Sequence, residues 1–473
     1  MEFTGVPFLV CMPLFAVLYR FAPAQSRALL LTFASYGFYA ATNAKMALLL
    51  AAATLAAFFA ARVIGLTPQK TIKRTILLAF VLVMAGMLIA FKSSVLLRPL
   101  LGFDLLMPLG ISYYTFKAIG YVLDVYWGNI FAENDFFALA AYLAFFSQIV
   151  AGPIERAQSF LPQLQNRRAS LSQMMLGLQR VALGVFKKFV VADSLAVLVN
   201  FIYSHVHAAG TPLAAGFYAY PLQLYADFSG LSDIAIGAAL LLGMVSPENF
   251  HAPFAASNPT EFWRRWHITL TTWLTDYVFT PLRMATRDWG NAGLVLSLSI
   301  NMTLIGAWHG FRWGYVLFGL VHALYLSVDA LTQRARKRYY KAHPGMNRLT
   351  DWLGPVVVFH LAAAAFVVFR AQTTHDAFYV LTHPANGLAA PSLEFLKMSQ
   401  ANVVALIAGL VGYALIEAAD WARRRNQQNS PAVAWPRWGR WSLYSCTVVT
   451  VAVMILLLMG GHASQNPFIY EIF

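Results

Sequence analysis

The stretch KMALLLAAATLAAFFAAR, residues 45–62, carries no charged side chain between Lys45 and Arg62. Its length approaches the roughly 20 apolar residues with which a helix crosses a bilayer. Similar apolar runs occur at 6–22, 28–42, 75–91, 105–127, 137–151, 172–203, 212–225, 229–245, 291–308, 312–330, 352–370, 402–420 and 441–460. The sequence therefore predicts an all-α integral membrane protein with about 11 transmembrane helices, in which the shorter runs form re-entrant or interfacial helices.

The composition favours the same class of protein. Hydrophobic residues make up 59% of the 473 residues and charged residues 11%, and the mean hydropathy is +0.59. Soluble proteins carry about 25% charged residues, which excludes a chain of ordinary soluble domains. Because no stretch is typical of a soluble module, we expect a single membrane-embedded domain over residues 1–473.

The excess of basic residues indicates topology. The net charge is +14, and the basic side chains gather in three connections, at 61–74, 334–341 and 423–428. The positive-inside rule places such connections in the cytoplasm. We therefore expect membrane lipids as neighbours of this multi-pass protein and no nucleic-acid partner.

Cysteine content and short motifs exclude several kinds of site. Cys11 and Cys446 both lie in apolar runs, so neither a disulfide framework nor a cysteine zinc cluster is available. The chain has no glycine-rich phosphate loop, GxSxG elbow or HExxH pair. The sequence predicts no metal site and no permanently bound cofactor.

A histidine interrupts the apolar stretch NMTLIGAWHG, residues 301–310. His309 is either a packing residue bonded to a backbone carbonyl or part of a site, because polar groups inside membranes usually mark one. Gly306, Gly310 and Gly314 recur at every fourth position around it. They either allow close helix packing or leave room for a thin substrate beside the imidazole.

Residues 247–283 are aromatic but carry several charges, which is typical of a short interfacial helix or a funnel. Within SNPTEF, the sequence predicts a helix start with Ser257 or Asn258 as cap, Pro259 in the first turn and Glu261 at the positive end.

The histidine of this region allows two interpretations. Trp263, His267 and Thr271 are expected on one face of a continuous helix. His267 then either shares acid and base chemistry with another histidine or faces lipid headgroups in an aromatic belt with Trp266 and Trp273.

Two pairs of charged residues lie in apolar surroundings. In YADFSGLSDIAIG (225–237), Asp227 and Asp233 lie at the start of an apolar helix, where either could orient a histidine. The favoured alternative is helix capping by Ser229, Ser232 and Asp233. Lys187 and Lys188 either meet phosphates or extend to the cytoplasmic interface.

Several segments together resemble one protein family. They are MPLGISYYTFKAIGYVLDVYWG (107–128), QIVAGPIERAQSFLPQL (148–164), LYADFSGLSDIAIG (224–237), NFHAPFAASNPTEFWRRWHITLTTWLTDYVFTPL (249–282) and GAWHG (306–310). In this order they look like the bacterial membrane-bound O-acyltransferase (MBOAT) family, in its alginate- and cellulose-acetylating branch. The resemblance makes 105–330 the core that carries the family motifs.

The resemblance implies a helical bundle in the bacterial inner membrane, with buried histidines at a tunnel between two funnels. His309 matches the family's essential histidine, and His267 matches a second one. The implied donor substrate is acetyl-CoA from the cytoplasm. The acetyl group would pass to a periplasmic partner of the SGNH type that O-acetylates an exopolysaccharide.

Physical chemistry assigns roles to these residues as hypotheses. A hydroxyl needs a base within hydrogen-bond reach to become a good nucleophile, and we expect His309 to be that base. The oxyanion donor is either His267 or a tryptophan N–H. Further expected contributions are CoA-phosphate contacts from Arg264, Arg265, Lys187 and Lys188, and a substrate channel lined by Gly306, Trp308, Gly310, Trp263 and Asp233.

Three alternatives stay open. The chain transfers D-alanine from a carrier protein to teichoic acid, or carries an acyl group or lipid without chemistry, or only docks other subunits. His309→Ala separates an acyltransferase from a carrier that does no chemistry, because only a catalyst needs the imidazole.

Overall fold

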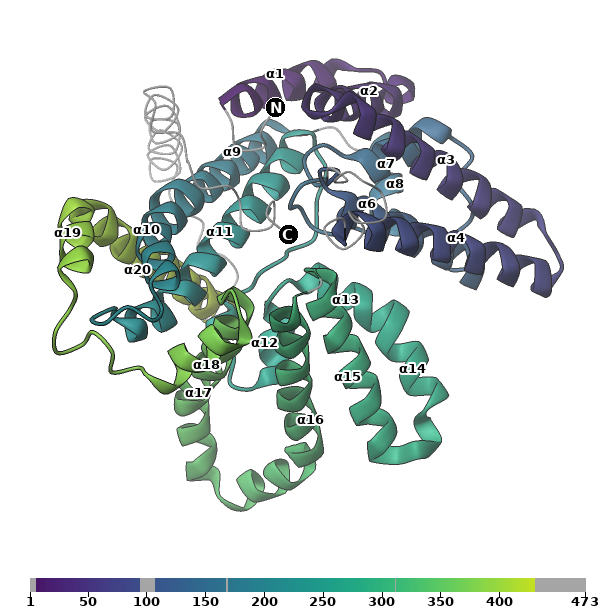
Figure 1. The fold of residues 1–473 in the computed structure, drawn as a ribbon. Helices are drawn as coiled ribbons and strands as arrows, with labels where there is room; N and C mark the ends of the chain where they lie inside the picture. The colour runs from purple at the N-terminus through teal and green to yellow at the C-terminus, as the bar shows by residue number, and fades with distance from the viewer. Residues whose placement is uncertain (1–5, 94–106, 167–168, 311, 430–473) are drawn as a thin grey trace. The chain divides into compact units, whose positions relative to one another are not determined.

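The computed structural model describes residues 6–93, 107–166, 169–310 and 312–429, and these ranges contain helices but no strand (Figure 1). The described residues divide into two compact units. Unit 1 holds those up to 185 together with 231–248, and unit 2 holds 186–230 together with those from 249 onward. The division crosses one long helix, α11 (Leu213–Leu241).

Unit 1 is built from the N-terminal helices, with α6 packed against both α3 and α4. Its helices are α1 (Val6–Phe21), α2 (Ala24–Thr42), α3 (Ala44–Leu66), α4 (Lys70–Lys92), α6 (Ile111–Trp127), α7 (Phe136–Ala144), α8 (Ala157–Asn166), α9 (Leu171–Val185) and the C-terminal part of α11. Residues 45–62 form most of α3, as predicted.

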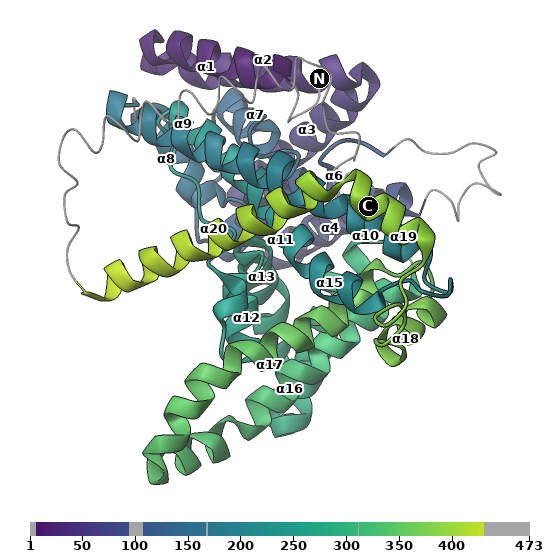
Figure 2. The same cartoon turned by 90° about the vertical axis from the view of Figure 1, so that its left-hand side faces the viewer.

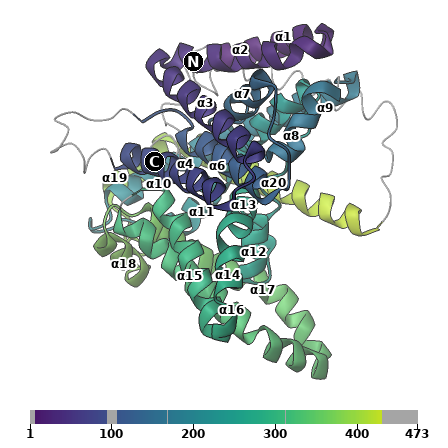
Figure 3. The same cartoon turned by 90° about the vertical axis from the view of Figure 1, so that its right-hand side faces the viewer.

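Unit 2 contains a hairpin of two long helices, α16 and α17, which lie side by side in Figure 2. Figure 3 shows α15 beside α14 and α16. The elements of unit 2 are the π-helix η1 (Phe186–Ala192), α10 (Asp193–Ser204), the start of α11, η2 (Pro253–Ala255), α12 (Pro259–Arg265), α13 (Ile268–Leu274), η3 (Thr275–Phe279), α14 (Thr280–Ala285), η4 (Arg287–Trp289), α15 (Gly290–Trp308), α16 (Trp313–Ala342), α17 (Pro344–Arg370), α18 (Thr374–Thr382), α19 (Leu393–Ala401) and α20 (Val403–Asn429).

The chain is a multi-pass membrane protein. Within the described residues, six stretches are long and apolar enough to cross a bilayer, or seven if the bent pair α19 and α20 forms one span. The six are α3, α4, α11, residues 287–308, α16 and residues 349–370. The expected number of about 11 spans is not confirmed: the run 137–151 forms only the nine-residue α7, and 441–460 lies outside the described residues.

The prediction that 212–225 and 229–245 are separate runs is wrong, because α11 is one helix of 29 residues. Asp227 and Asp233 therefore lie inside α11 and do not cap it. Each buried carboxylate has a basic partner from an earlier helix: Lys188 bonds to Asp227 at 2.9 Å, and Arg180 pairs with Asp233. Such pairing compensates the cost of burying a charge in a helix interior.

Two polar residues of the segment 148–164, Gln148 and Glu155, belong to a buried hydrogen-bond network. In unit 1, Lys117 donates from Nζ to Gln148 Oε1 at 2.6 Å. Gln148 in turn donates from Nε2 to Glu155 at 2.6 Å and to Ser246 at 2.8 Å. These four side chains are buried, so the glutamine links a lysine and a glutamate that water cannot reach.

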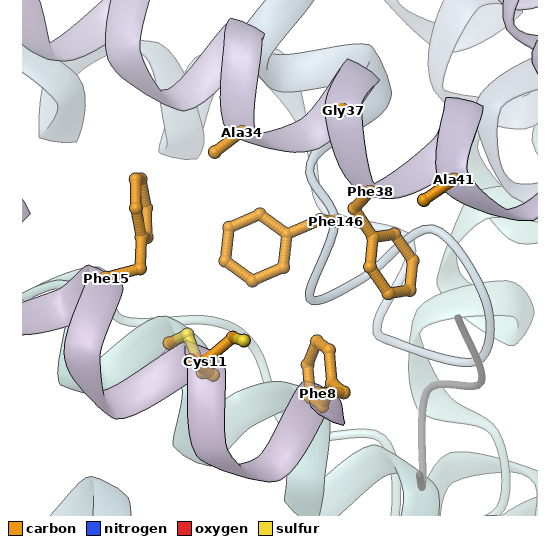
Figure 4. Close-up of a pocket in the computed structure, with 9 residues that line it drawn as sticks. Phe8, Cys11, Phe15, Ala34, Gly37, Phe38, Ala41 and Phe146 are labelled. Atoms are coloured by element: carbon orange, nitrogen blue, oxygen red, sulfur yellow. The ribbon is translucent and has the colours of Figure 1, made fainter. Parts of the chain in front are cut away.

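An apolar groove of about 280 Å³ opens between α1 and α2 (Figure 4). Its lining is Phe8, Cys11, Met12, Phe15, Ala34, Gly37, Phe38, Ala41 and Phe146. This set supplies no group for acid–base chemistry other than a thiol.

Candidate active site

His309 lies where three helices of unit 2 meet. It follows the last residue of α15, and its backbone N–H donates to the carbonyl of Gly306 at 3.0 Å. The imidazole packs edge-on against Phe369 near the end of α17, with ring centroids 4.8 Å apart. Tyr315 of α16 lies 6.1 Å away. The ring is 5% exposed, so the surrounding aromatic side chains fix its position.

His267 occupies a break between α12 and α13, which corrects the predicted continuous helix. Its backbone is left-handed, with φ of 44°. The cause is pairing with a preceding loop: the Ile268 N–H donates to the Asn249 carbonyl, and the His251 N–H donates to the Arg265 carbonyl, each at 2.9 Å. A left-handed non-glycine residue costs roughly 1–3 kcal/mol and is found often at functional sites.

The predicted start of α12 is confirmed. Asn258 caps it by accepting from the Glu261 N–H at 2.8 Å, and Pro259 is the first helical residue. Because the helix ends at Arg265, Trp263 and Thr271 do not share a continuous helical face with His267.

Asn249 determines which nitrogen of His267 carries the proton. The Asn249 side-chain oxygen accepts from the Thr269 N–H at 3.3 Å and from the Thr269 hydroxyl at 2.9 Å. The same oxygen lies 3.1 Å from His267 Nδ1. Since an oxygen can only accept, Nδ1 must donate, and in the neutral ring Nε2 is an acceptor. This assignment follows from the hydrogen-bond network.

The other nitrogen of His267 is available for chemistry. Nε2 is buried and has no hydrogen-bond partner among the described residues. Burial lowers the pKa of His267, which lies outside the candidate spans, to about 3. The ring is therefore neutral near pH 7, and Nε2 can accept a hydrogen bond. In this state Nε2 has no hydrogen to donate to an oxyanion.

The aromatic-belt interpretation of His267 is wrong. Trp263, Trp266 and Trp273 are each at most 5% exposed and His267 is 2% exposed, so these rings do not face headgroups. They form part of the interior of unit 2.

His267 and His309 both lie beside the indole ring of Trp308. The ring of Trp308 lies 4.5 Å from the ring of His309 and 6.0 Å from that of His267. The structure thus brings together His267, Trp308 and His309, which the sequence singled out separately. Two buried imidazoles thus lie around one aromatic ring, and the Nε2 of His267 is a bare acceptor that can hold a substrate by a hydrogen bond.

Sequence reasoning missed two residues next to this group. Asn249 is the first residue of the segment NFHAPF, but no neighbouring residue in the sequence indicates that this asparagine is buried and bonded to a histidine. His322 of α16 is 2% exposed and accepts from the Trp263 indole N–H at 3.2 Å. Its spacing from Phe318 and Tyr315, four and seven residues earlier, puts the three on one face of α16. This spacing is the sequence pattern that could have indicated His322.

The glycines near His309 permit close packing. A Cβ on Gly306 would lie 2.0 Å from the Tyr315 carbonyl oxygen, and one on Gly314 would lie 2.7 Å from the Val368 carbonyl oxygen. Gly310 has φ of 146° and faces the Tyr315 ring. The space that Gly306 and Gly314 leave is therefore filled by neighbouring helices. A channel role for Gly306 and Gly310 stays a prediction.

The candidate phosphate-binding residues have different surroundings. Lys187 and Lys188 are buried, which contradicts their extension to the interface. The Lys188 ammonium bonds to Asp193 at 3.1 Å as well as to Asp227. Arg265 pairs with Glu261 at 2.6 Å. Arg264 is exposed, and of these four it is the side chain best placed to meet a soluble anion.

Asp233, another expected channel residue, lies in unit 1 and pairs with Arg180. Trp263 and Trp308 lie in unit 2 with the histidines. Channel roles for these three residues stay predictions.

Comparison with known proteins places these residues in a family context. The sequence pattern of the membrane-bound O-acyltransferase family matches residues 130–370. A probable alginate O-acetylase, AlgI, of Pseudomonas fluorescens is 34% identical over 369 residues, covering 77% of this chain and 72% of the relative. A peptidoglycan O-acetyltransferase of Helicobacter pylori is 31% identical, covering 79% and 78%. A teichoic acid D-alanyltransferase of Bacillus subtilis is 30% identical, covering 58% and 71%.

Proposed function

Because the chain belongs to the membrane-bound O-acyltransferase family and is an O-acyltransferase, we propose that it moves acetyl groups from cytoplasmic acetyl-CoA across the bacterial inner membrane. The acceptor is a hydroxyl on the periplasmic side, either of an SGNH-type partner or of the polymer itself. The final product is an O-acetylated exopolysaccharide of the alginate or cellulose type. Relatives named for acetyl transfer to alginate and peptidoglycan support acetyl as the acyl group.

The observation that carries this proposal is the pair of buried imidazoles on Trp308. The acceptor oxygen attacks the thioester carbonyl carbon, a C–O bond forms, and the C–S bond breaks to release CoA thiolate. His309 takes the hydroxyl proton as general base and returns it to the thiolate. His267 Nε2 accepts a hydrogen bond from the substrate and orients it. An indole N–H is then the remaining candidate for the oxyanion donor.

Arg264 has the exposure that an anion-binding residue needs. A guanidinium binds phosphate in a bidentate manner. We propose that it attracts the CoA phosphates at the donor entrance and that Arg265 contributes less. The burial of Lys187 and the two aspartate partners of Lys188 disfavour phosphate contacts from these lysines.

Transfer of D-alanine is the second candidate, favoured by the likeness to the Bacillus subtilis teichoic acid D-alanyltransferase. That likeness covers less of this chain than either likeness to an acetyltransferase described above. The two functions differ in the acyl donor, so one assay separates them.

We expect the purified full chain in lipid vesicles to transfer radiolabelled acetyl from acetyl-CoA to alginate oligosaccharides when an SGNH-type partner is present. Labelled D-alanyl carrier protein should give no transfer under the same conditions. Vesicles with only the partner provide the control. Transfer from the D-alanyl carrier alone would contradict the acetyl proposal, and equal acetyl transfer without this chain would reduce it to a docking subunit.

Asn249→Ala should lower the acetyl transfer rate by about 100-fold, the loss that a misplacement of about 1 Å in a site produces. The substitution removes the acceptor that holds the proton on His267 Nδ1. Asn249→Asp keeps an acceptor oxygen and should recover part of the rate. Steady-state rates at saturating donor measure both variants. An Asn249→Ala rate within about twofold of the wild-type rate would show that the orientation of His267 does not matter.

A further inference from the structure

Three side chains of metal-ligand type meet at the start of α18. His207 lies in the link between α10 and α11, while His375 and Asp376 lie in the first turn of α18. One ligand atom from each lies within 4.8 Å of the others. His207 Nε2 is 2.8 Å from Asp376 Oδ1, and the His207 and His375 ring centroids are 5.2 Å apart.

We propose that His207, His375 and Asp376 bind a divalent transition metal ion of the zinc class. Imidazole nitrogen and carboxylate oxygen are zinc ligands at about 2.0–2.2 Å, and three protein ligands leave a fourth position for water. Ligands at such lengths on a tetrahedral ion lie roughly 3.4 Å apart. The three ligand atoms now lie within 4.8 Å of one another, and a rotation of the half-exposed His207 side chain would close them to that spacing.

The carboxylate is already oriented for this role. Asp376 Oδ2 accepts from the Thr373 N–H at 3.0 Å, and the Asp376 N–H donates to the Thr373 hydroxyl at 3.1 Å. This capping box fixes the side chain and leaves Oδ1 directed at His207. Carboxylates that ligate a metal are usually held by hydrogen bonds of this kind.

The link that carries His207 is held against the region after α18 without any metal. The Ser392 N–H donates to the Gly210 carbonyl at 2.9 Å. The Asn386 side chain donates to the Ala208 carbonyl and accepts from the Gly210 N–H, each at 3.3 Å. Residues separated by 169 positions, His207 and Asp376, are thus brought together by the backbone. This separation explains why the sequence predicted no metal site.

An ion pair between His207 and Asp376 alone gives no role to His375, which lies beside them. Among the described residues, the ring nitrogens of His375 have no hydrogen-bond partner, although the ring lies beside His207. A metal uses all three side chains. The positive-inside rule predicts that the start of α17, which follows the basic connection 334–341, lies in the cytoplasm. Because α18 follows the opposite end of α17, we expect the metal site on the outer side of the membrane, where it can bind ions from outside the cell membrane.

Cobalt(II) tests the site directly, because its tetrahedral complexes absorb visible light. We expect the tag-free full chain in detergent to bind one cobalt ion, which zinc displaces, and zinc to raise the midpoint of thermal unfolding. His207→Asn and His375→Asn should each weaken cobalt binding by at least about 100-fold, since even outer partners of metal ligands contribute about 10- to 100-fold. His383→Asn, an exposed histidine at the far end of α18, is the matched control and should bind normally.

The absence of cobalt binding to the wild-type chain overturns the proposal. Unchanged binding by the His207→Asn/His375→Asn double variant also overturns it, because the ion then lies elsewhere. A measurement on the wild-type chain avoids any folding defect. Zinc should protect His207 and His375, but not His383, from diethyl pyrocarbonate as read by peptide mass spectrometry, and equal modification with and without zinc contradicts the site. None of these readouts depends on acyl transfer.

Discussion

Replacing His309 by alanine should lower the acetyl transfer rate by about 10²- to 10⁴-fold, the contribution of a positioned general base. The imidazole is 5% exposed and packs against Phe369 and Trp308. Its loss leaves the acceptor hydroxyl without the proposed proton acceptor. Initial rates of labelled acetyl transfer in vesicles measure the effect. His309→Gln, which keeps more of the side-chain volume, should be as inactive if the proton and not the packing is what matters.

Hydroxylamine distinguishes a base from a residue that merely shapes the site. This small nucleophile is unprotonated near pH 7 and attacks thioesters without general-base help. His309→Ala should therefore retain most of its transfer to hydroxylamine while losing transfer to hydroxyl acceptors. Loss of both reactions would indicate that His309 positions the donor, and wild-type transfer to hydroxyls would show that it is not the base. A thermal midpoint equal to that of the wild-type chain confirms that the variant is folded.

His267 requires a different variant, because its backbone is left-handed. Asparagine tolerates this conformation better than alanine does. A loss of transfer in His267→Asn is therefore attributable to the missing ring. The same variant tests whether Nε2 orients the acceptor, since it should then raise KM for the acceptor together with the loss in kcat.

Local features were predictable from the sequence because their causes are local. The start of α12 depends on Asn258, Pro259 and Glu261, which act within one turn. Apolar length predicted α3 in the same way. His309 was recognisable as unusual because a single polar ring in an apolar run is rare.

Features that depend on distant partners were not predictable. The break at His267 arises from the loop at Asn249, which shares no periodic pattern with it. Asp233 looked like a cap, since its partner Arg180 lies 53 residues away. The expected number of spans is not confirmed for a related reason: length and hydropathy cannot show that the run 137–151 folds into one short helix.

Gly306→Leu should prevent normal folding of the chain. Even an alanine Cβ at this position would lie 2.0 Å from the Tyr315 carbonyl oxygen and 3.2 Å from the Gly319 nitrogen. The reciprocal contact is equally close, since a Cβ on Gly319 would lie 2.4 Å from the Met302 carbonyl oxygen. Overpacking a well-packed core typically costs about 1–3 kcal/mol, and backbone atoms cannot rotate away as side chains do. The yield of monodisperse protein and its thermal midpoint measure the loss.

Gly86 of α4 offers the matched control, because nothing lies within 4 Å of a Cβ built there. Gly86→Leu should give normal yield and midpoint, which separates steric conflict from the mere loss of a glycine. The comparison also decides between the two interpretations of the glycines around His309. If Gly306→Leu folds normally and still transfers no acetyl group, the space beside Gly306 serves a substrate. If the chain loses its fold, α15 and α16 need that space to approach each other, and it is their approach that places His309 against Phe369 and Tyr315.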